Sequence, residues 1–208
     1  MKIAVFGATG RTGLPLIERA LDGGHEVVAH TRSPEKLPQR DRLVVVGGDA
    51  YTGAGVVEAV SGVDAIVSVL GQGSNSPGDL LTVSGDHILG AMAETGVGRL
   101  VVLVGAGVRE EGESVTLAGR AMGLLLRVVA GDVLDDATEH VRRVKATDPE
   151  WSVVRAPRLT EGGPEGAYRV GDVALGFDAV DRADVAACLL DRVENGDYVR
   201  EMPKVGPA

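Results

Sequence analysis

Three glycines near the start of the chain, Gly7, Gly10 and Gly13, have the spacing with the clearest chemical meaning, and they follow an apolar run from Ile3 to Phe6. The first glycine lets the backbone turn off the end of a strand, the second lets it approach a bound group closely, and the third lets a helix pack against that strand. The free N–H groups and the dipole of such a helix favour an anion at its start. The spacing therefore predicts a loop that binds the pyrophosphate of a dinucleotide.

A second candidate site lies at the end of a strand predicted over 26–31, about twenty residues after the loop. An enzyme that prefers NAD carries Asp or Glu there, where the carboxylate binds the ribose 2'-hydroxyl. This chain has neither residue at positions 29–34 and has Arg32 instead, with Ser33 beside it and Arg11 in the glycine loop. A guanidinium offers paired donors to a phosphate, so these residues predict NADP rather than NAD. The alternative is an exposed loop arginine without a ligand.

Strands and helices alternate along the rest of the chain, as a parallel sheet requires. The hydrophobic pattern predicts further strands over 43–46, 63–70, 99–104 and 152–155, and helices over 12–21, 56–60, 77–94, 117–145 (interrupted near Gly131) and 181–193. We therefore expect an α/β, Rossmann-type fold, with one doubly wound parallel sheet in three α/β/α layers. Residues 1–208 would form a single NAD(P)-binding domain, with a small substrate-side portion at about 105–130 and 156–180.

Two segments are predicted to lie outside this regular scaffold. The charged, glycine-containing segment 108–114 reads as a mobile loop at the carboxyl edge of the sheet. The tail from Asp197 reads as short and exposed.

Composition excludes several classes of partner. The formal net charge of -9 disfavours nucleic acid and anionic membranes, because an acidic surface is repelled by phosphate. The single cysteine, Cys188, has no partner for an internal disulfide and lies in an apolar run, and no leader segment is apparent, so we expect a reducing cytoplasmic location. The longest apolar patch, Leu124 to Val129, is far shorter than the ~20 residues of a membrane span. We expect a monomer or a weak homodimer that acts on a small molecule.

Five motifs recur in order along nearly the whole chain at the spacing of one group of proteins. They are FGATGRTG at 6–13, Thr31-Arg32-Ser33, Gly47-Gly48-Asp49, Val69-Leu70-Gly71 and VRAPRL at 154–159. In these motifs the sequence resembles the atypical short-chain dehydrogenases/reductases, and among them the NmrA-like and biliverdin reductase B (flavin reductase) proteins.

The resemblance implies roles for residues beyond the three glycines. Thr9 and Thr12 would donate hydroxyl hydrogen bonds to phosphates. Asp49 with Ala50 would border the adenine, although Asp49 also suits a simple turn after two glycines. At the carboxyl ends of the later strands, the residues implied to meet the cofactor are Leu70, Gly71, Gly105 and Pro157, with Arg158 and Thr160 beside the substrate.

The pair of residues that drives alcohol dehydrogenation in the short-chain dehydrogenases is missing. Tyr51, Tyr168 and Tyr198 are followed four residues later by Gly, Asp and Met rather than by the lysine of a Tyr-x-x-x-Lys pair. Position 105 is glycine where the relatives often carry Ser or Thr. Ordinary alcohol dehydrogenation, which needs a tyrosine base, is therefore disfavoured.

The chemistry that remains is hydride transfer by positioning, in which NADPH is the donor and the protein supplies orientation and a dry pocket. A flavin, a quinone or a similar small conjugated molecule suits as acceptor, because its reduced anion can take a proton from water. His87 and His140 are the candidate proton donors, and each also suits a packed or solvated helix position.

An alternative function is that of an NmrA-like regulator, which senses the NADP state without turnover. The apolar patch from Leu124 to Val129 would then meet a protein partner, whereas in an enzyme it would line the substrate pocket. No metal site is predicted, because the carboxylates at 135, 136 and 139 suit a solvated helix face better than a ligand set.

Overall fold

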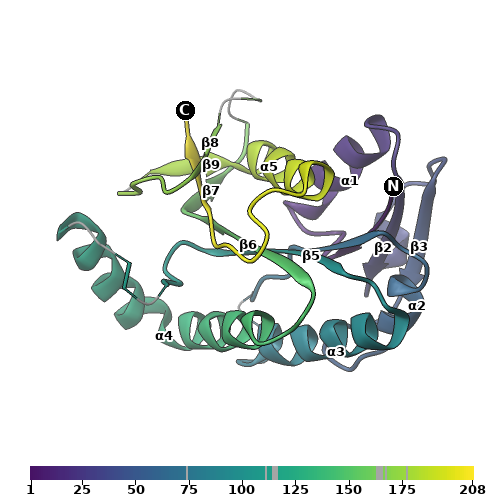
Figure 1. Ribbon diagram of the computed structural model, residues 1–208, viewed down its shortest axis with the longest axis horizontal. Coiled ribbons are helices and arrows are strands. Elements are labelled where there is room, and N and C mark those ends of the chain that lie inside the picture. The colour runs from purple at the N-terminus through teal and green to yellow at the C-terminus, as the bar shows by residue number, and fades with distance from the viewer. Residues whose placement is uncertain (74, 111, 114–116, 163–165, 167, 177) are drawn as a thin grey trace.

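The computed structural model describes residues 1–208 except 74, 111, 114–116, 163–165, 167 and 177 (Figure 1). In the helix that begins at Leu117 it describes the backbone, but not the side chains of 117–122, 124–126, 128 and 129. The apolar patch from Leu124 to Val129 therefore lies outside the described side chains.

A sheet of eight strands forms the centre of the molecule, in the order β3-β2-β1-β4-β5-β6-β10-β8. Its strands are β1 (Lys2–Phe6), β2 (Glu26–Thr31), β3 (Leu43–Gly47), β4 (Ala65–Ser68), β5 (Arg99–Gly105), β6 (Glu150–Ala156), β8 (Tyr168–Gly171) and β10 (Lys204–Pro207). Neighbouring strands are parallel except for β8 and β10, which are antiparallel. A separate parallel pair is formed by β7 (Arg158–Thr160) and β9 (Ala179–Asp181).

Strand β1 lies inside the parallel part of the sheet and places the glycine loop. Val5 pairs with Ala29 of β2 on one side and with Val67 of β4 on the other. All three side chains are fully buried, as expected for strands covered on both faces. The carboxyl ends of β1, β2 and β4 therefore meet at one edge of the sheet, which is where ligands bind in open α/β folds.

Helices cover both faces of the sheet, so the predicted three-layer Rossmann-type fold is confirmed (Figure 1). One face carries α1 (Gly13–Asp22) and α5 (Arg182–Asn195), and the other carries α2 (Val56–Val60), α3 (Leu80–Thr95) and α4 (Leu117–Lys145). Each face has its own hydrophobic core: Phe6 and Ile66 pack in one, and Val5 and Leu189 in the other. A short 3-10 helix, η1 (Pro34–Lys36), follows β2.

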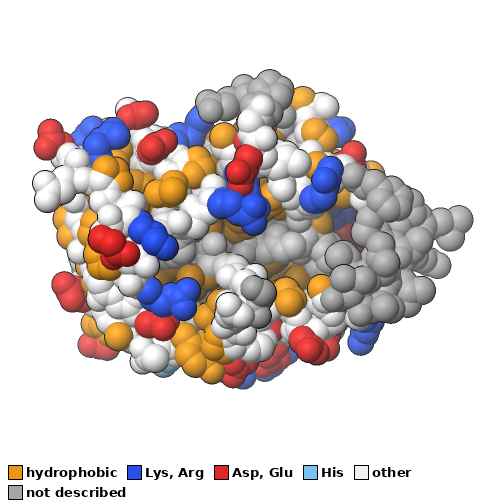
Figure 2. Space-filling model, turned by 180° about the vertical axis from the view of Figure 1, so that it is seen from behind, with side chains coloured by type: hydrophobic (Ala, Val, Ile, Leu, Met, Phe, Trp, Pro, Cys, Tyr) orange, Lys and Arg blue, Asp and Glu red, His pale blue; other side chains and the backbone are white. Residues whose placement is uncertain are grey.

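The charges on the surface and the lengths of the helices concern the possible partners of the protein. Basic and acidic side chains are interspersed on the face that Figure 2 shows, so the net charge of -9 forms no single acidic patch there. None of the helices in the described part of the chain is both long and apolar enough to span a membrane.

The start of α5 and the interruption of α4 each lie within one residue of the predicted position. Asp181 caps α5, because its Oδ1 accepts a hydrogen bond from the N–H of Ala183 at 2.9 Å. The long helix α4 loses helical geometry at Ala130, where φ is -143° and ψ is 38°, one residue before the predicted interruption at Gly131. In contrast, α3 begins at Leu80 rather than at 77.

The prediction that the tail from Asp197 is short and exposed is wrong. Met202 is 3% exposed, Val205 is fully buried, and β10 inserts between β6 and β8. Only four residues form β10, and Gly206 and Pro207 are two of them, so the segment lacks the apolar pattern by which a strand is recognised. Its conformation depends on pairing with strands from distant parts of the chain.

Candidate cofactor-binding site

The glycine loop has the geometry that its spacing predicts. Gly7 has a φ of +83°, and a Cβ at this residue would lie 2.9 Å from the backbone carbonyl of Val69. A Cβ at Gly13 would lie 2.2 Å from the Gly7 carbonyl oxygen, so only glycine lets α1 pack this closely. Thr12 occupies the N-cap position of α1 without a side-chain hydrogen bond to the helix. The start of α1 thus has no side-chain anion of its own and is suited to a pyrophosphate.

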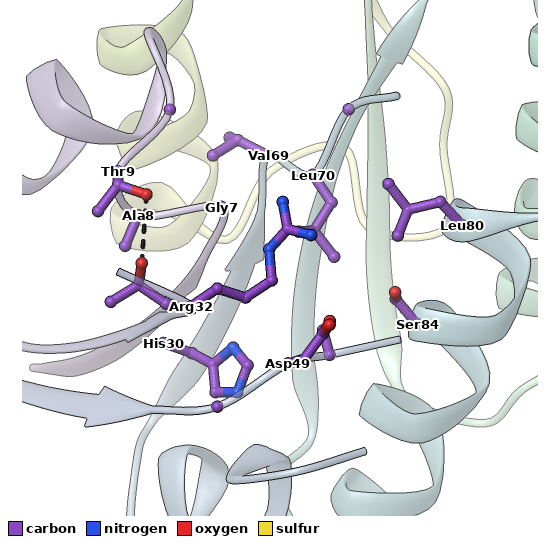
Figure 3. A pocket seen from close by; sticks show the side chains of 15 residues that line it. Gly7, Ala8, Thr9, His30, Arg32, Asp49, Val69, Leu70, Leu80 and Ser84 are labelled. Atoms are coloured by element: carbon purple, nitrogen blue, oxygen red, sulfur yellow. Dashed lines mark hydrogen bonds between the residues drawn. The ribbon is translucent and has the colours of Figure 1, made fainter. Parts of the chain in front are cut away.

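A cleft of about 200 Å³ opens beside the loop at the carboxyl ends of β1, β2 and β4 (Figure 3). The predicted residues that line it are Gly7, Thr9, Gly10, Arg32, Asp49, Ala50, Leu70 and Gly71. The other predicted cofactor residues, Arg11, Thr12, Gly13, Ser33, Gly105 and Pro157, are not among its lining residues, and their contacts with a cofactor stay predictions. Lining residues that sequence reasoning missed include His30, Thr31, Leu80 and Ser84.

The missed residues differ in how visible they are in the sequence. His30 and Thr31 end β2 at the same sheet edge as Arg32. The rule that ligands bind at the carboxyl ends of parallel strands would therefore have been enough to predict them. Leu80 and Ser84 belong to α3, and no local pattern tells which turn of a helix borders a cleft.

Arg32 projects from the end of β2 into the cleft. Its side chain reaches across the cleft, and its guanidinium lies between Leu70 and Asp49 in the view of Figure 3. In the part of the chain that the structure describes, no ion-pair partner holds this guanidinium. A guanidinium with free donors that faces a cleft is suited to a phosphate group.

The Thr31 hydroxyl connects the glycine loop to the residues after β2. It accepts a hydrogen bond from the N–H of Ser33 at 3.0 Å and lies 3.2 Å from the Thr9 hydroxyl (Figure 3). Thr31 is buried, so these contacts are shielded from water. They fix the backbone on both sides of Arg32 relative to the loop.

Asp49 forms a turn and also lines the cleft, so its position suits both roles that the sequence left open, a simple turn and a border of the adenine. Its Oδ1 accepts a hydrogen bond from the N–H of Tyr51 at 3.0 Å, as in a turn, and the residue also lines the cleft. His87 of α3 supports the same turn, because its Nδ1 lies 2.9 Å from the Ala50 carbonyl oxygen. This contact places His87 beside the end of the cleft that is predicted to hold the adenine.

The wall of the cleft formed by α3 is fixed by a residue of α4. Asp136, which is 7% exposed, accepts hydrogen bonds from the N–H groups of Leu81 and Thr82 at 2.8 and 3.0 Å. It also accepts one from the Gln72 side chain at 2.7 Å. The prediction of a solvated face is therefore wrong for Asp136, which caps α3 from another helix, whereas the side chain of Asp79 at the N-cap position makes no capping hydrogen bond to α3. This distant cap explains why α3 begins later than predicted.

We expect Asp136→Ala to lower the free energy of unfolding by about 2 to 3 kcal/mol, because three donors in or near the core lose a charged acceptor. The matched control is the exposed neighbour Asp135, whose change to alanine should cost no more than about 0.5 kcal/mol. Urea denaturation of both variants measures the difference. Equal stability of the two variants would contradict the capping role.

A largely buried ion cluster anchors the segment after β5 at the carboxyl edge of the sheet. Arg155 of β6 lies 2.5 Å from one carboxylate oxygen of Glu113, and Lys204 of β10 lies 2.6 Å from the other. Burial opposes the charge of Glu113, but the hydrogen bonds from Lys204 and Arg155 outweigh it and lower its pKa to about 2. Arg155 also donates to the Val108 carbonyl at 3.2 Å. The segment 108–114, which the sequence predicts to be a mobile loop, is thus bonded to the sheet at Val108 and Glu113.

The candidate proton donor His140 is buried against Gly85 of α3, outside the residues that line the cleft. Burial lowers the pKa of His140 to about 4, so its imidazole is neutral at physiological pH. Its role as a donor stays a prediction. Within the described residues, no group of three or more His, Cys, Asp or Glu side chains is arranged to hold a metal ion.

Two tyrosines and the cysteine have environments that do not favour their ionised forms. Tyr51 donates a hydrogen bond to Asp79, which raises the pKa of the phenol. Burial raises the pKa of Tyr168, and its hydrogen bond to Asp191 raises it further. Cys188 is fully buried, as predicted, and burial raises its pKa to about 12. None of these three groups is suited to act as a base or a nucleophile at neutral pH.

A family model described as NAD(P)H-binding matches residues 7–196 of the chain. The uncharacterized protein YwnB of Bacillus subtilis (strain 168) is 26% identical over 97% of this chain and 96% of its own length. A 3-beta-hydroxysteroid dehydrogenase of Mycolicibacterium neoaurum is 38% identical over 65 residues, which are 31% of this chain. That match spans only 18% of the dehydrogenase, and matches to three uncharacterized mycobacterial proteins span only 12% of each.

Solved structures share the whole fold at low sequence identity. The structure of ChuY, an anaerobillin reductase from Escherichia coli O157:H7, superimposes with a TM-score of 0.81 at 19% identity. The match covers 100% of this chain and 97% of that one. This likeness concerns the arrangement of strands and helices.

Proposed function

Because the chain belongs to the NAD(P)H-binding family, we propose that it is an NADPH-dependent oxidoreductase that transfers hydride to a flavin, a quinone or a similar small conjugated acceptor. The observation that carries the choice of NADPH is Arg32, whose guanidinium faces the cleft beside the glycine loop and has no partner among the described residues. The name of one relative in fold, a reductase, is consistent with this class of reaction.

The residues that line the cleft are suited to the pyrophosphate and adenosine parts of such a cofactor. The glycine loop and the start of α1 would hold the pyrophosphate, Arg32 the 2'-phosphate, and the Asp49–Ala50 turn the adenine. The ends of β5 and β6, with Gly105 and Pro157, would face the nicotinamide, and Arg158 and Thr160 would border the acceptor. When bound, NADPH supplies the hydride. The chain binds and orients the two reactants and keeps water from them.

The environments of two tyrosines support a mechanism without a tyrosine proton donor. The hydrogen bond of Tyr51 to a carboxylate, and for Tyr168 burial together with such a bond, raise the pKa of each phenol and make it a weaker acid. Tyr198 lies 3.5 Å from the Val170 carbonyl oxygen. An acceptor whose reduced form is a stabilised anion needs no proton during hydride transfer. Its proton can come afterwards from water.

The experiment that tests the proposal is an assay of NADPH oxidation with flavins, quinones and small aldehydes as acceptors. We expect turnover with at least one flavin or quinone and none with the aldehydes, because reduction of an aldehyde needs a proton donor. Tight NADPH binding without turnover on any acceptor would contradict the enzyme and favour the NmrA-like regulator.

We expect each Tyr→Phe change, at residues 51, 168 and 198, to lower turnover by less than about tenfold. Loss of a general acid or base typically costs ~10²-fold or more, and the hydride route described above uses neither. The variants His87→Ala and His140→Ala test the other candidate donors in the same assay. A fall of ~10²-fold in any one variant, with NADPH affinity unchanged, would assign acid–base catalysis to that residue.

A further inference from the structure

Arg182, the first residue of α5, reaches the glycine loop from the far end of the sequence. Its Nη1 donates a hydrogen bond of 3.0 Å to Oγ1 of Thr12, across a separation of 170 residues. The Arg182 side chain is only 15% exposed, so this contact is largely shielded from water. Thr12 is buried too and stands at the N-cap of α1.

The direction of this hydrogen bond decides what the Thr12 hydroxyl can do. Arginine has only donors, so the Thr12 oxygen must accept, and its own proton must point elsewhere. Among the described residues no acceptor takes that proton, and the hydroxyl does not cap α1. The proton is therefore free to meet an acceptor at the start of α1, where the helix favours an anion.

Glu161 holds Arg182 from its other side. One Glu161 oxygen lies 3.2 Å from Nε of Arg182 and 3.5 Å from Nη1 of Arg11. The first contact is an ion pair without hydrogen-bond alignment, because the buried Nε of Arg182 has no hydrogen-bond partner. Two guanidinium groups against one carboxylate leave a net positive charge beside the loop. The Glu161 side chain is 58% exposed, against 15% for that of Arg182, so Glu161 is the more accessible partner of this pair.

We propose that Arg182 is a positioning residue for the pyrophosphate, which it serves by holding the Thr12 hydroxyl as a donor toward the anion. This inference rests on the proposed function, which places a dinucleotide at the loop. Arg182 acts through Thr12 and makes no phosphate contact of its own. Its loss should therefore matter only while the Thr12 hydroxyl is present.

The test is a double-mutant cycle on NADPH binding, measured by calorimetric titration of wild type, Arg182→Met, Thr12→Val and the double variant. We expect each single variant to raise Kd by about five- to tenfold, since each removes one hydrogen bond to or through a charged group. The double variant should bind within about twofold of Thr12→Val alone, because the two changes remove the same interaction.

Three controls separate positioning from a general effect on the fold. Arg182→Lys keeps a charged donor, so it should restore affinity to within about threefold of wild type. Glu161→Gln leaves the Thr12 contact intact, so it should not weaken binding. Adenosine 2'-monophosphate lacks the pyrophosphate, so its Kd should be the same for wild type and Arg182→Met. If the role of Arg182 is merely structural, Arg182→Met should weaken the binding of both NADPH and adenosine 2'-monophosphate.

Two results would overturn the inference: an Arg182→Met variant that binds NADPH like wild type, or a double variant whose loss is the product of the two single losses. Failure of the proposed function is a different result, in which wild type binds no NADPH. The same cycle is then read with inorganic pyrophosphate as the probe. Equal pyrophosphate affinity of wild type and Arg182→Met, or none in either protein, would also reject the role of Arg182.

Discussion

A Gly10→Val variant should lose NADPH affinity by about 100-fold or more while it stays folded, since the new side chain would project into the space of the pyrophosphate. Gly10 is exposed and lines the cleft. A Cβ on this residue would lie 3.0 Å from the Gly7 carbonyl oxygen, so the exposed loop must shift by a few tenths of an ångström to admit it. The substitution therefore acts on the ligand more than on the fold.

Thermal melting with and without NADPH measures this effect and its control together. A ligand at 100 times its Kd stabilises the folded state by about 2.7 kcal/mol, and this stabilisation should fall to about 0.4 kcal/mol or less in the variant. The matched control is Gly98→Val, because Gly98 is also exposed, its Cβ would meet no atom within 4 Å, and it precedes β5 at the opposite edge of the sheet. If Gly10→Val is stabilised by NADPH as much as the control, the loop is not the phosphate site.

The second large effect concerns the choice between NADPH and NADH. Wild type should bind NADPH at least about tenfold more tightly, because a charge-assisted pair with the 2'-phosphate contributes about 1.5 to 3 kcal/mol. Arg32→Ala should abolish most of this preference by weakening NADPH while it leaves NADH nearly unchanged. Arg11 should contribute less, because it pairs with Glu161 and does not line the cleft.

Calorimetric titration of both cofactors against wild type and Arg32→Ala gives the four constants that are needed. Arg19→Ala is the matched control, because Arg19 is equally exposed but lies at the far end of α1. Equal affinity of wild type for the two cofactors, or an unchanged preference in Arg32→Ala, would contradict the assignment of Arg32 to the 2'-phosphate.

The predictions that the structure confirms depend on residues close together in the sequence. The turn at Gly7, the strand that ends at Thr31 and the start of α5 beside Asp181 each follow from a few neighbouring residues, whose conformational preferences are strong. The parallel sheet follows from the regular alternation of such local units.

The features that the sequence did not reveal join residues that are far apart. Asp136 caps a helix whose first turn lies 54 and 55 residues earlier, and Arg182 reaches Thr12 across 170 residues. Neither residue differs in type or spacing from an ordinary charged residue on a helix. The prediction of an exposed tail is wrong for the same reason, because pairing with β6 and β8, rather than its own apolar content, holds β10 in the sheet.

The cap that Asp136 places on α3 also makes the motion of the cleft wall observable. Backbone N–H groups in the first turn of a helix normally have no partner within the helix, so their protons exchange quickly with solvent deuterium. The amides of Leu81 and Thr82 are instead bonded to a buried carboxylate of α4. Their exchange requires α3 and α4 to separate, so the deuterium uptake of these two amides reports how often this wall opens while the rest of the sheet stays folded.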